Sequence, residues 1–304
     1  MNQVTAHFVT LWCAIFAKLE KGLERQLGGV SLTVLQYRVL LQVARPETVE
    51  VREARLARVL MARPSAISMS VDALRQRGLV LVKEDSGDAR ALIVGISDEG
   101  HRCLKTVNAR VERFLEASWQ SLDLLEFTLL MEMMYDSLAK PGGFFVYLDP
   151  SVRRGERLPL PYLLTFMSMF TQVVTTTAKK GADLSLTEYR FLLELLPKRR
   201  DVVKRLRARE FVGLLRVKRS YVTTASYKLA EAGLIVREPD PDDARGILFT
   251  LTAEGERAVS LIGDDVAAVF EGMFARGSQG RARVMRLAKK LLSGVDAVLG
   301  GENP

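Results

Sequence analysis

The chain contains one long internal repeat. The stretch "GDARALIVGISDEGHRCL", which starts at Gly87, returns as "DDARGILFTLTAEGERAV", which starts at Asp242. Both read Asp-Ala-Arg, then an apolar run, then Ser or Thr, and shortly afterwards an acidic residue and Gly. A second pair keeps the same offset, "LRQRGLVLV" at Leu74 and "LAEAGLIVR" at Leu229. A period of this length that occurs twice predicts a duplicated domain rather than a solenoid.

The length of the chain agrees with two domains of ordinary size, since it has 304 residues. A stretch rich in Pro and Gly separates the two copies and is typical of a connector. We therefore predict a first unit at residues 1–140, a linker at 141–160 and a second unit at 161–304.

Each copy predicts the same order of secondary structure. A long amphipathic helix comes first and a shorter helix follows. Two short helices are predicted next, in the first copy at 53–61 and 64–77. Two β-rich runs around a turn-rich tip then predict a hairpin, and two long helices at 98–118 and 122–140 complete the unit. The predicted fold is mainly α with small β-hairpin wings, an α+β class in which each unit is a winged helix-turn-helix.

The predicted helix 64–77 has the two faces of a DNA recognition helix. At 3.6 residues per turn, Ile67, Val71 and Leu74 share one side, which predicts contact with the core. The opposite side carries small polar side chains, which let a helix lie deep in the major groove. The residues that we predict to contact DNA here are Arg63, Ser65, Ser68 and Met69.

The equivalent helix of the second copy has a more basic face that is rich in hydroxyl groups. Val222 and Leu229 point inward by the same spacing. Hydroxyls can reach bases or phosphates, and a helix N-terminus favours phosphate. For either helix alone, an amphipathic surface helix without function is the alternative, but two such helices inside matching units favour DNA binding. The predicted contacts are Lys218, Arg219, Ser220, Thr223 and Thr224.

The tip of each predicted hairpin pairs an acid with an arginine. Arg90 and Arg245 stand two residues after Asp88 and Asp243, and residues i and i+2 of a strand share a face. The carboxylate can therefore steer the guanidinium group, and an arginine near a hairpin tip suits the narrow minor groove of DNA. The alternative is an Asp–Arg pair that only braces the wing, and both roles can hold together.

The charge of the chain also indicates a polyanionic partner. The formal net charge is +8, and the basic residues are unevenly placed. The segment 198–219 contains ten basic residues and two acids, whereas the matching segment 43–64 contains five and three. We therefore expect unequal contacts in the two halves, with more salt-dependent phosphate binding by the second unit.

Other classes of function find little support in the sequence. Cys13 and Cys103 are too few for a disulfide framework, and two histidines cannot form a His-rich metal site. We expect no metal, no cofactor and, because no catalytic motif stands out, no enzyme. The N-terminal apolar run lacks the positive flank of a signal peptide. Residues 158–178 are uncharged but amphipathic as a helix, which favours docking on protein over a membrane span.

The residues of both copies resemble the MarR (multiple antibiotic resistance regulator) family of bacterial transcription factors. The resemblance rests on "LTVLQYRVL" at Leu32, "VDALRQRGLV" at Val71 and the wing "DARALIVGISDEG" at Asp88. In the second copy it rests on "LTEYRFLLEL", "SYKLAEAGLIVREPDPDDARG" and "LTAEGERA". The wing pattern is specific, and the resemblance covers almost the whole chain.

The resemblance implies a cytoplasmic regulator that binds double-stranded operator DNA. Family members are usually homodimers whose first and last helices interlock and whose winged helices each read half of a pseudo-palindrome. Because two units are fused here, the resemblance implies an intramolecular pseudo-dimer around a pseudo-twofold axis, with half-sites about one helical turn apart. A further homodimer of the chain stays open. Repression is the commoner mode of the family, so we expect a repressor that an effector releases.

The family often binds small amphipathic or phenolic ligands between the dimer helices and the DNA-binding lobe. Six aromatic residues could line such crevices, although aromatic residues at helical spacing are more often core. They are Trp12, Phe16, Tyr37, Phe166, Phe170 and Tyr189. Cys13 has apolar neighbours, which favours an inert thiol over an oxidant sensor.

Two alternatives to a balanced pair of DNA readers stay open. The chain could be a winged-helix protein-interaction module with little or no operator binding, although the basic segment 198–219 argues against it. In a mixed case, only the second unit would grip DNA strongly.

Overall fold

A computed structural model shows the fold of the chain. It describes residues 3–45, 51–138, 160–197, 203–215, 217–271 and 280–301. Residues 141–159 of the predicted linker lie outside the described residues, and Leu160, its last predicted residue, begins a helix.

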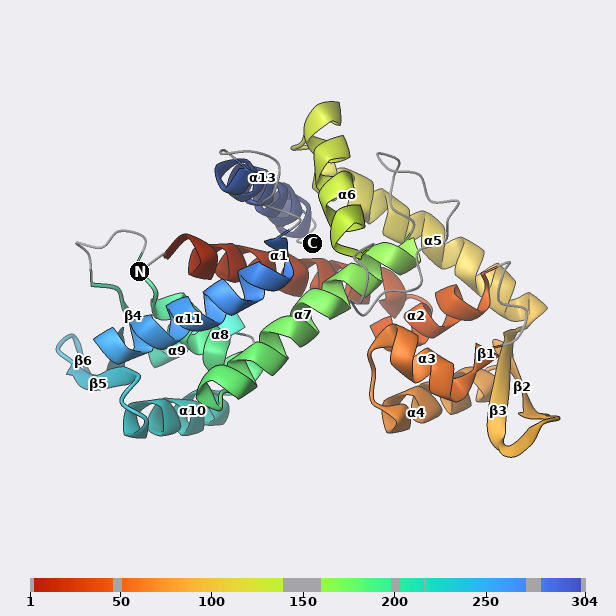
Figure 1. The fold of residues 1–304 in the computed structure, drawn as a ribbon, viewed down its shortest axis with the longest axis horizontal. Helices are drawn as coiled ribbons and strands as arrows, with labels where there is room; N and C mark the ends of the chain where they lie inside the picture. The colour runs from red at the N-terminus through yellow and green to blue at the C-terminus, as the bar shows by residue number, and fades with distance from the viewer. Residues whose placement is uncertain are drawn as a thin grey trace. The chain divides into compact units, whose positions relative to one another are not determined.

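The described part contains the same order of helices and strands twice. The elements can be followed in Figure 1, where the colour runs from red at the N-terminus to blue at the C-terminus. The first copy consists of α1 (Gln3–Gly28), α2 (Val34–Val43), β1 (Val51–Arg52), α3 (Glu53–Leu60), α4 (Pro64–Gln76), β2 (Val80–Asp85), β3 (Asp88–Ile96), α5 (Asp98–Trp119) and α6 (Leu124–Leu138). The second consists of α7 (Leu160–Ala182), α8 (Leu186–Leu195), β4 (Arg205–Arg207), α9 (Ala208–Leu215), α10 (Arg219–Glu231), β5 (Ile235–Asp240), β6 (Asp243–Leu251), α11 (Ala253–Val269) and α13 (Gly280–Gly301). The predicted class, mainly helical with small β-hairpin wings, is confirmed.

The chain divides into two compact units that differ from the sequence repeats. One comprises Met1–Cys13 with Thr171–Glu271 and contains the second wing, so we call it the second-wing unit. The other comprises Ala14–Phe170 with Gly272–Pro304 and is the first-wing unit. Both α1 and α7 run from one unit into the other. The limits 1–140 and 161–304, which describe the repeats, stay a prediction.

Each compact unit is built from both copies of the repeat. In the second-wing unit the start of α1 packs on α11, where the Thr5 hydroxyl donates to Asp264 at 2.5 Å. In the first-wing unit α13 packs on α5 and α6, and Lys290 donates to Glu126 at 2.6 Å. Each unit therefore combines a winged helix with helices from the ends of both repeats.

The wing of each unit is a three-stranded antiparallel sheet. The strand orders are β1-β3-β2 and β4-β6-β5. The longer strand of each hairpin, β3 or β6, therefore lies in the middle of its sheet. In the second-wing unit Phe249 of β6 pairs with Leu206 of β4 on one side and Arg237 of β5 on the other. The sequence predicted the hairpins but not β1 and β4, which have only two and three residues.

The recurring Ser/Thr-x-x-Gly at the end of each wing has a steric cause. The Thr252 hydroxyl accepts from the Gly255 amide at 2.9 Å and donates to the Gly233 carbonyl at 2.7 Å. A Cβ atom on Gly255 would lie 2.1 Å from the carbonyl oxygen of Leu234. Gly100 has the same close approach to the Leu79 carbonyl, also at 2.1 Å. The glycine thus lets the next helix start directly against the strand backbone.

We expect Gly255→Ala to lower the free energy of unfolding of the chain by about 1–3 kcal/mol, because overpacking against backbone must displace one of the two elements. Thermal and denaturant unfolding followed by circular dichroism measure the loss. The control is Gly213→Ala on α9, where an added Cβ meets nothing within 4 Å. A Gly255→Ala protein as stable as this control would contradict the steric reading.

Candidate nucleic-acid interface

The helix α4 presents the predicted polar face to solvent. It starts with Arg63 as its N-cap residue and Pro64 in its first turn, and no side chain caps its free amide groups. Ile67, Val71 and Leu74 are buried, as their spacing predicted. The predicted DNA-contacting residues of this helix are exposed: Arg63, Ser65, Ser68 and Met69. The side chain of Met69 is 74% exposed, which is unusual for so large an apolar group.

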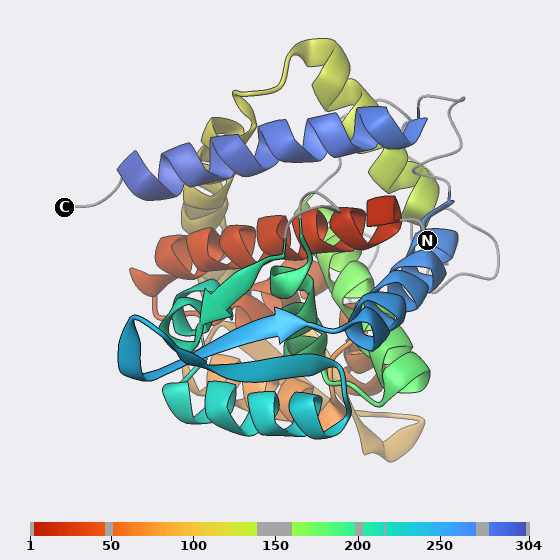
Figure 2. The same cartoon turned by 90° about the vertical axis from the view of Figure 1, so that its left-hand side faces the viewer.

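The helix α10 repeats this arrangement in the second-wing unit, which faces the viewer in Figure 2. Val222 and Leu229 are buried, together with Ala225 and Ser226. The five predicted DNA-contacting residues are all exposed: Lys218, Arg219, Ser220, Thr223 and Thr224. The hydroxyls of the two threonines donate to backbone carbonyls of their own helix, so their free lone pairs face outward as acceptors.

The predicted wing residues lie at the tips of the two sheets. Asp88 starts β3 and Asp243 starts β6, and both are exposed. Arg90 and Arg245 belong to the same strands, but their side chains lie outside the described part of the structure. The Asp–Arg pairing within each strand and the minor-groove contact therefore stay predictions.

A second acid, which the sequence patterns did not single out, also braces each wing. Arg52 at the end of β1 pairs with Asp85 at the end of β2, next to the wing turn, with Nε and Oδ2 2.6 Å apart. In the second-wing unit Arg207 at the end of β4 pairs with Asp240, whose side chain is fully buried, and also with Asp242 at 2.9 Å. The signal was present in the sequence, because both partners recur at the same offset as the rest of the repeat.

The electrostatics of the brace keep its carboxylates ionised. The hydrogen bond from Arg207 is the main cause that lowers the pKa of Asp240, and the amide of Asp242 adds to it at 3.1 Å. The amide of Gly87, 2.9 Å away, and the charge of Arg52 lower the pKa of Asp85 in the same way. Each wing turn is therefore held by a charged hydrogen-bond cluster that ties it to the strand before α3 or α9.

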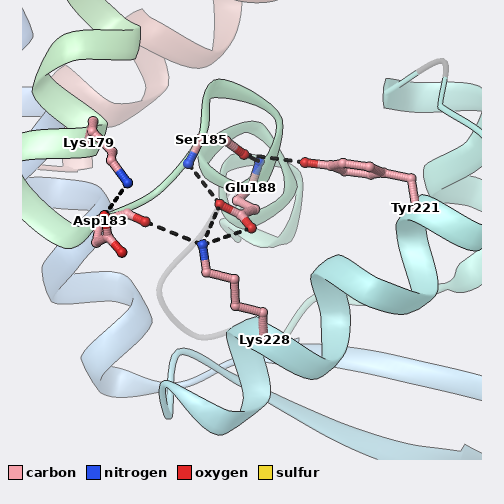
Figure 3. A network of polar contacts seen from close by, with 6 residues as sticks. All are labelled: Lys179, Asp183, Ser185, Glu188, Tyr221 and Lys228. Carbon is pink, nitrogen blue, oxygen red and sulfur yellow. Dashed lines mark hydrogen bonds and ion pairs between the residues drawn. The ribbon is translucent and has the colours of Figure 1, made fainter.

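A second polar network holds α10 in place, and Figure 3 shows it. Lys228 on the last turns of α10 donates to Glu188 at 3.2 Å and to the Asp183 carbonyl at 3.4 Å. The Ser185 amide donates to the same Glu188 carboxylate at 2.7 Å, and the Ser185 and Tyr221 hydroxyls lie 3.3 Å apart. Burial would raise the pKa of Glu188, but these hydrogen bonds hold it below its usual value.

The first-wing unit anchors its recognition helix differently. Arg77, the C-cap residue of α4, donates to the carbonyls of Val30 at 2.7 Å and Ser31 at 2.8 Å. Ser31 and Asp183 occupy equivalent places in the two copies, and both have a positive φ, 51° and 53°. Each recognition helix is thus tied to the turn that follows the first long helix of its repeat, by an arginine in one copy and a lysine in the other.

The six aromatic residues predicted as possible ligand contacts are all buried: Trp12, Phe16, Tyr37, Phe166, Phe170 and Tyr189. Three of them meet in the first-wing unit, where the Phe16 ring packs edge-on against Phe166 and Phe170 with centroids 5.9 and 5.3 Å apart. The Tyr37 hydroxyl donates to Asn108 at 2.7 Å. They serve as core residues, and a ligand role for them stays a prediction.

No group of three or more potential ligands among the described residues could hold a metal ion, and none of the described helices is long and apolar enough to cross a membrane. Burial raises the pKa of the Cys13 thiol to about 12, so it is protonated at neutral pH and a poor nucleophile.

Part of the chain is similar to a known protein family. Residues 201–247, which include β4, α9, α10 and β5, match the model of the MarR family. No curated protein matches the chain. Among solved structures, a mutant MarR from E. coli is 20% identical, with a TM-score of 0.37 over 41% of this chain and 90% of that chain. The matched segment is therefore MarR-like.

Two further solved structures are similar over about a third of this chain. CouR from Rhodococcus jostii RHA1, bound to p-coumaroyl-CoA, is 30% identical, with a TM-score of 0.29 over 31% of this chain and 66% of that chain. A mutant MarR from E. coli complexed with operator DNA is 21% identical, with a TM-score of 0.30 over 32% and 68%. The similarity to these structures does not extend over the whole chain.

We expect Asp240→Asn to destabilise the chain at neutral pH and to flatten its response to acid. Because the pKa of Asp240 is lower in the folded protein than the value of about 3.9 in an unfolded chain, its stabilisation is present above that value and is lost as the pH falls. Chemical unfolding midpoints measured from pH 7 to pH 3 test this. Asp265→Asn, on the exposed side of α11, is the control. If the unfolding midpoints of the wild type and of Asp240→Asn fell in parallel from pH 7 to pH 3, the stabilising role of the Arg207–Asp240 pair would be contradicted.

Proposed function

We propose that the chain is a sequence-specific, double-stranded DNA-binding transcriptional regulator of the MarR type. Its two winged helices read the two halves of an imperfect palindrome from a single chain. One observation carries the proposal: in both copies, a helix with an exposed face of small polar and basic side chains packs beside a braced three-stranded wing. The match of residues 201–247 to the MarR family supports the same function for the second copy.

The exposed faces of α4 and α10 are chemically suited to the major groove. Ser65, Ser68, Ser220 and Thr223 are short enough to let the helix backbone approach the base edges, and hydroxyls bind bases or phosphates. No side chain caps the start of either helix, which leaves the positive end of each helix dipole available to a backbone phosphate. The chain is thus a binding protein in this proposal and not an enzyme.

The two reading faces differ, so the two half-sites should differ as well. Met69 of α4 stands where α10 has Thr224, and Asp72 stands where α10 has Tyr227. A methionine favours contact with a thymine methyl group, whereas a threonine can also form hydrogen bonds. A single chain with two unlike readers does not require a symmetric operator.

The mode of regulation follows the resemblance to the family. The proposal includes repression, with release of the DNA by a small amphipathic or phenolic effector, and a cytoplasmic location. Selection of bound duplexes from a random DNA pool, with the mass of the complex measured, tests the core of it. A preferred sequence bound by one chain supports the proposal, whereas no duplex binding at any salt concentration indicates a protein-interaction module instead.

We expect Thr223→Val to weaken binding to the selected operator by about 2- to 13-fold, the range of about 0.5–1.5 kcal/mol for one hydrogen bond. The substitution keeps the shape of the side chain and removes only its hydroxyl. Binding is measured by fluorescence anisotropy, on the operator and on unrelated DNA. Thr176→Val, on an exposed position of α7, is the matched control. An equal loss on both DNAs would show that Thr223 contacts the backbone rather than a base.

We expect Arg90→Ala and Arg245→Ala each to weaken operator binding, because each removes the arginine near one wing tip. Comparing the two variants on the same duplex separates a balanced pair from a chain that grips DNA mainly with the second winged helix. Similar losses indicate a balanced pair, and a loss confined to Arg245→Ala indicates the unequal case. If neither variant binds operator more weakly than wild type, the wings do not contact DNA.

A further inference from the structure

A cavity of about 600 Å³ opens between α10 and the wing of the second-wing unit. Its floor is apolar and includes Val222, Ile247 and Phe249. Three arginines from three different elements line it as well, Arg209 from α9, Arg219 from α10 and Arg237 from β5. Asp243 and Arg207 also line the cavity, but Arg207 is already paired with Asp240 and Asp242.

The three lining arginines add positive charge to the cavity, although Arg209 also acts on the carboxylate of Asp240. None of them forms an ion pair within the described part of the chain, in contrast to Arg207. The guanidinium of Arg237 lies over the ring of Tyr227, 3.4 Å from its centroid, which fixes its position. Its buried Nε atom has no hydrogen-bond partner among the described residues. Together the three guanidinium groups give the cavity a positive charge that favours an anionic oxygen from outside the chain.

The place of the cavity indicates which anion this is. If α10 lies in the major groove and the hairpin tip in the adjacent minor groove, one phosphodiester strand separates the two grooves. That strand must cross the surface between α10 and the wing, and the cavity lies there. We propose that Arg209, Arg219 and Arg237 form a clamp for the DNA backbone that only the second winged helix possesses. The inference rests on the proposed function.

The first winged helix lacks the residues of the clamp. At the equivalent positions it has Ala54, Pro64 and Val82 in place of the three arginines, while the bracing arginine is retained as Arg52. The wing brace is therefore present in both copies, whereas the three clamp arginines are present only in the second. The second winged helix therefore makes the larger share of the charge contacts with DNA, and the first makes fewer of them.

The test is the salt dependence of DNA binding by the full-length chain. Arg209→Ala and Arg237→Ala should each make the slope of log K against log salt shallower by about 0.9, the value for one phosphate contact. At 0.1 M salt this corresponds to a loss of about tenfold in affinity for one contact. The loss should be equal for operator and unrelated DNA, because a backbone contact carries no sequence information. Arg257→Ala, which removes an arginine of α11 paired with Glu254, should leave the slope unchanged.

A chemically modified duplex identifies the phosphate. Methylphosphonate linkages, which are uncharged, are placed between the major groove of one half-site and its adjacent minor groove, and then at the mirrored place in the other half. Neutralisation on the clamp side should weaken the wild type and have no further effect on an Arg209→Ala/Arg237→Ala double variant. On the other side it should affect both proteins alike.

The possible outcomes are distinct. Unchanged slopes in folded variants that still bind operator would overturn the clamp and leave the proposed function intact. A sequence-dependent loss would overturn it too, because the arginines would then read bases. Unchanged slopes together with a loss of benzoate binding, measured by calorimetry, would assign the cavity to a small organic anion. A wild-type chain that binds no duplex would instead refute the proposed function.

Discussion

The ion pair between the wing turn and the short strand before the helix-turn-helix is the constraint on which the rest of the interface depends. β4 ends at Arg207 and α9 begins at the next residue, so a bond from Arg207 to Asp240 joins the start of the helical part to the tip of the wing. Two elements far apart in the sequence are thereby fixed at one point. In the proposed function, this point keeps the distance between α10 and the wing tip constant, so that two adjacent DNA grooves can be contacted in a fixed register.

The periodic parts of the interface were predictable from the sequence. The inward and outward faces of α4 and α10 follow from a helical period of 3.6 residues, and the buried Ile67 and Val222 lie where it places them. The strands β1 and β4 were not predictable, because two or three residues have no period and their pairing is decided by β3 and β6. Tertiary pairing of this kind overrides local propensity.

The acid of the brace was missed for a related reason. A local pattern singles out Asp88 and Asp243, because each has an arginine two residues later in the same strand. The observed partners of Asp85 and Asp240 lie 33 residues earlier in the chain, at Arg52 and Arg207. A pair at that separation is invisible to any local pattern. It could be found only by asking which charged residues recur at the offset of the repeat.

Comparing the two copies distinguishes residues that stabilise a winged helix from residues that face a partner. The first kind is the same in both copies, and the second kind differs. The brace, the capping hydroxyl and the glycine against the strand backbone occur in both copies, at Arg52 and Arg207, Ser97 and Thr252, and Gly100 and Gly255. These residues satisfy steric and electrostatic demands that are the same in both units, so neither copy can lose them without cost. The exposed positions of α4 and α10 bear no such demand and have diverged. In two identical subunits each reading face would change together with its twin, whereas in a fused chain each can change alone. The difference between the exposed faces of α4 and α10 is therefore what separate contacts by the two halves would produce.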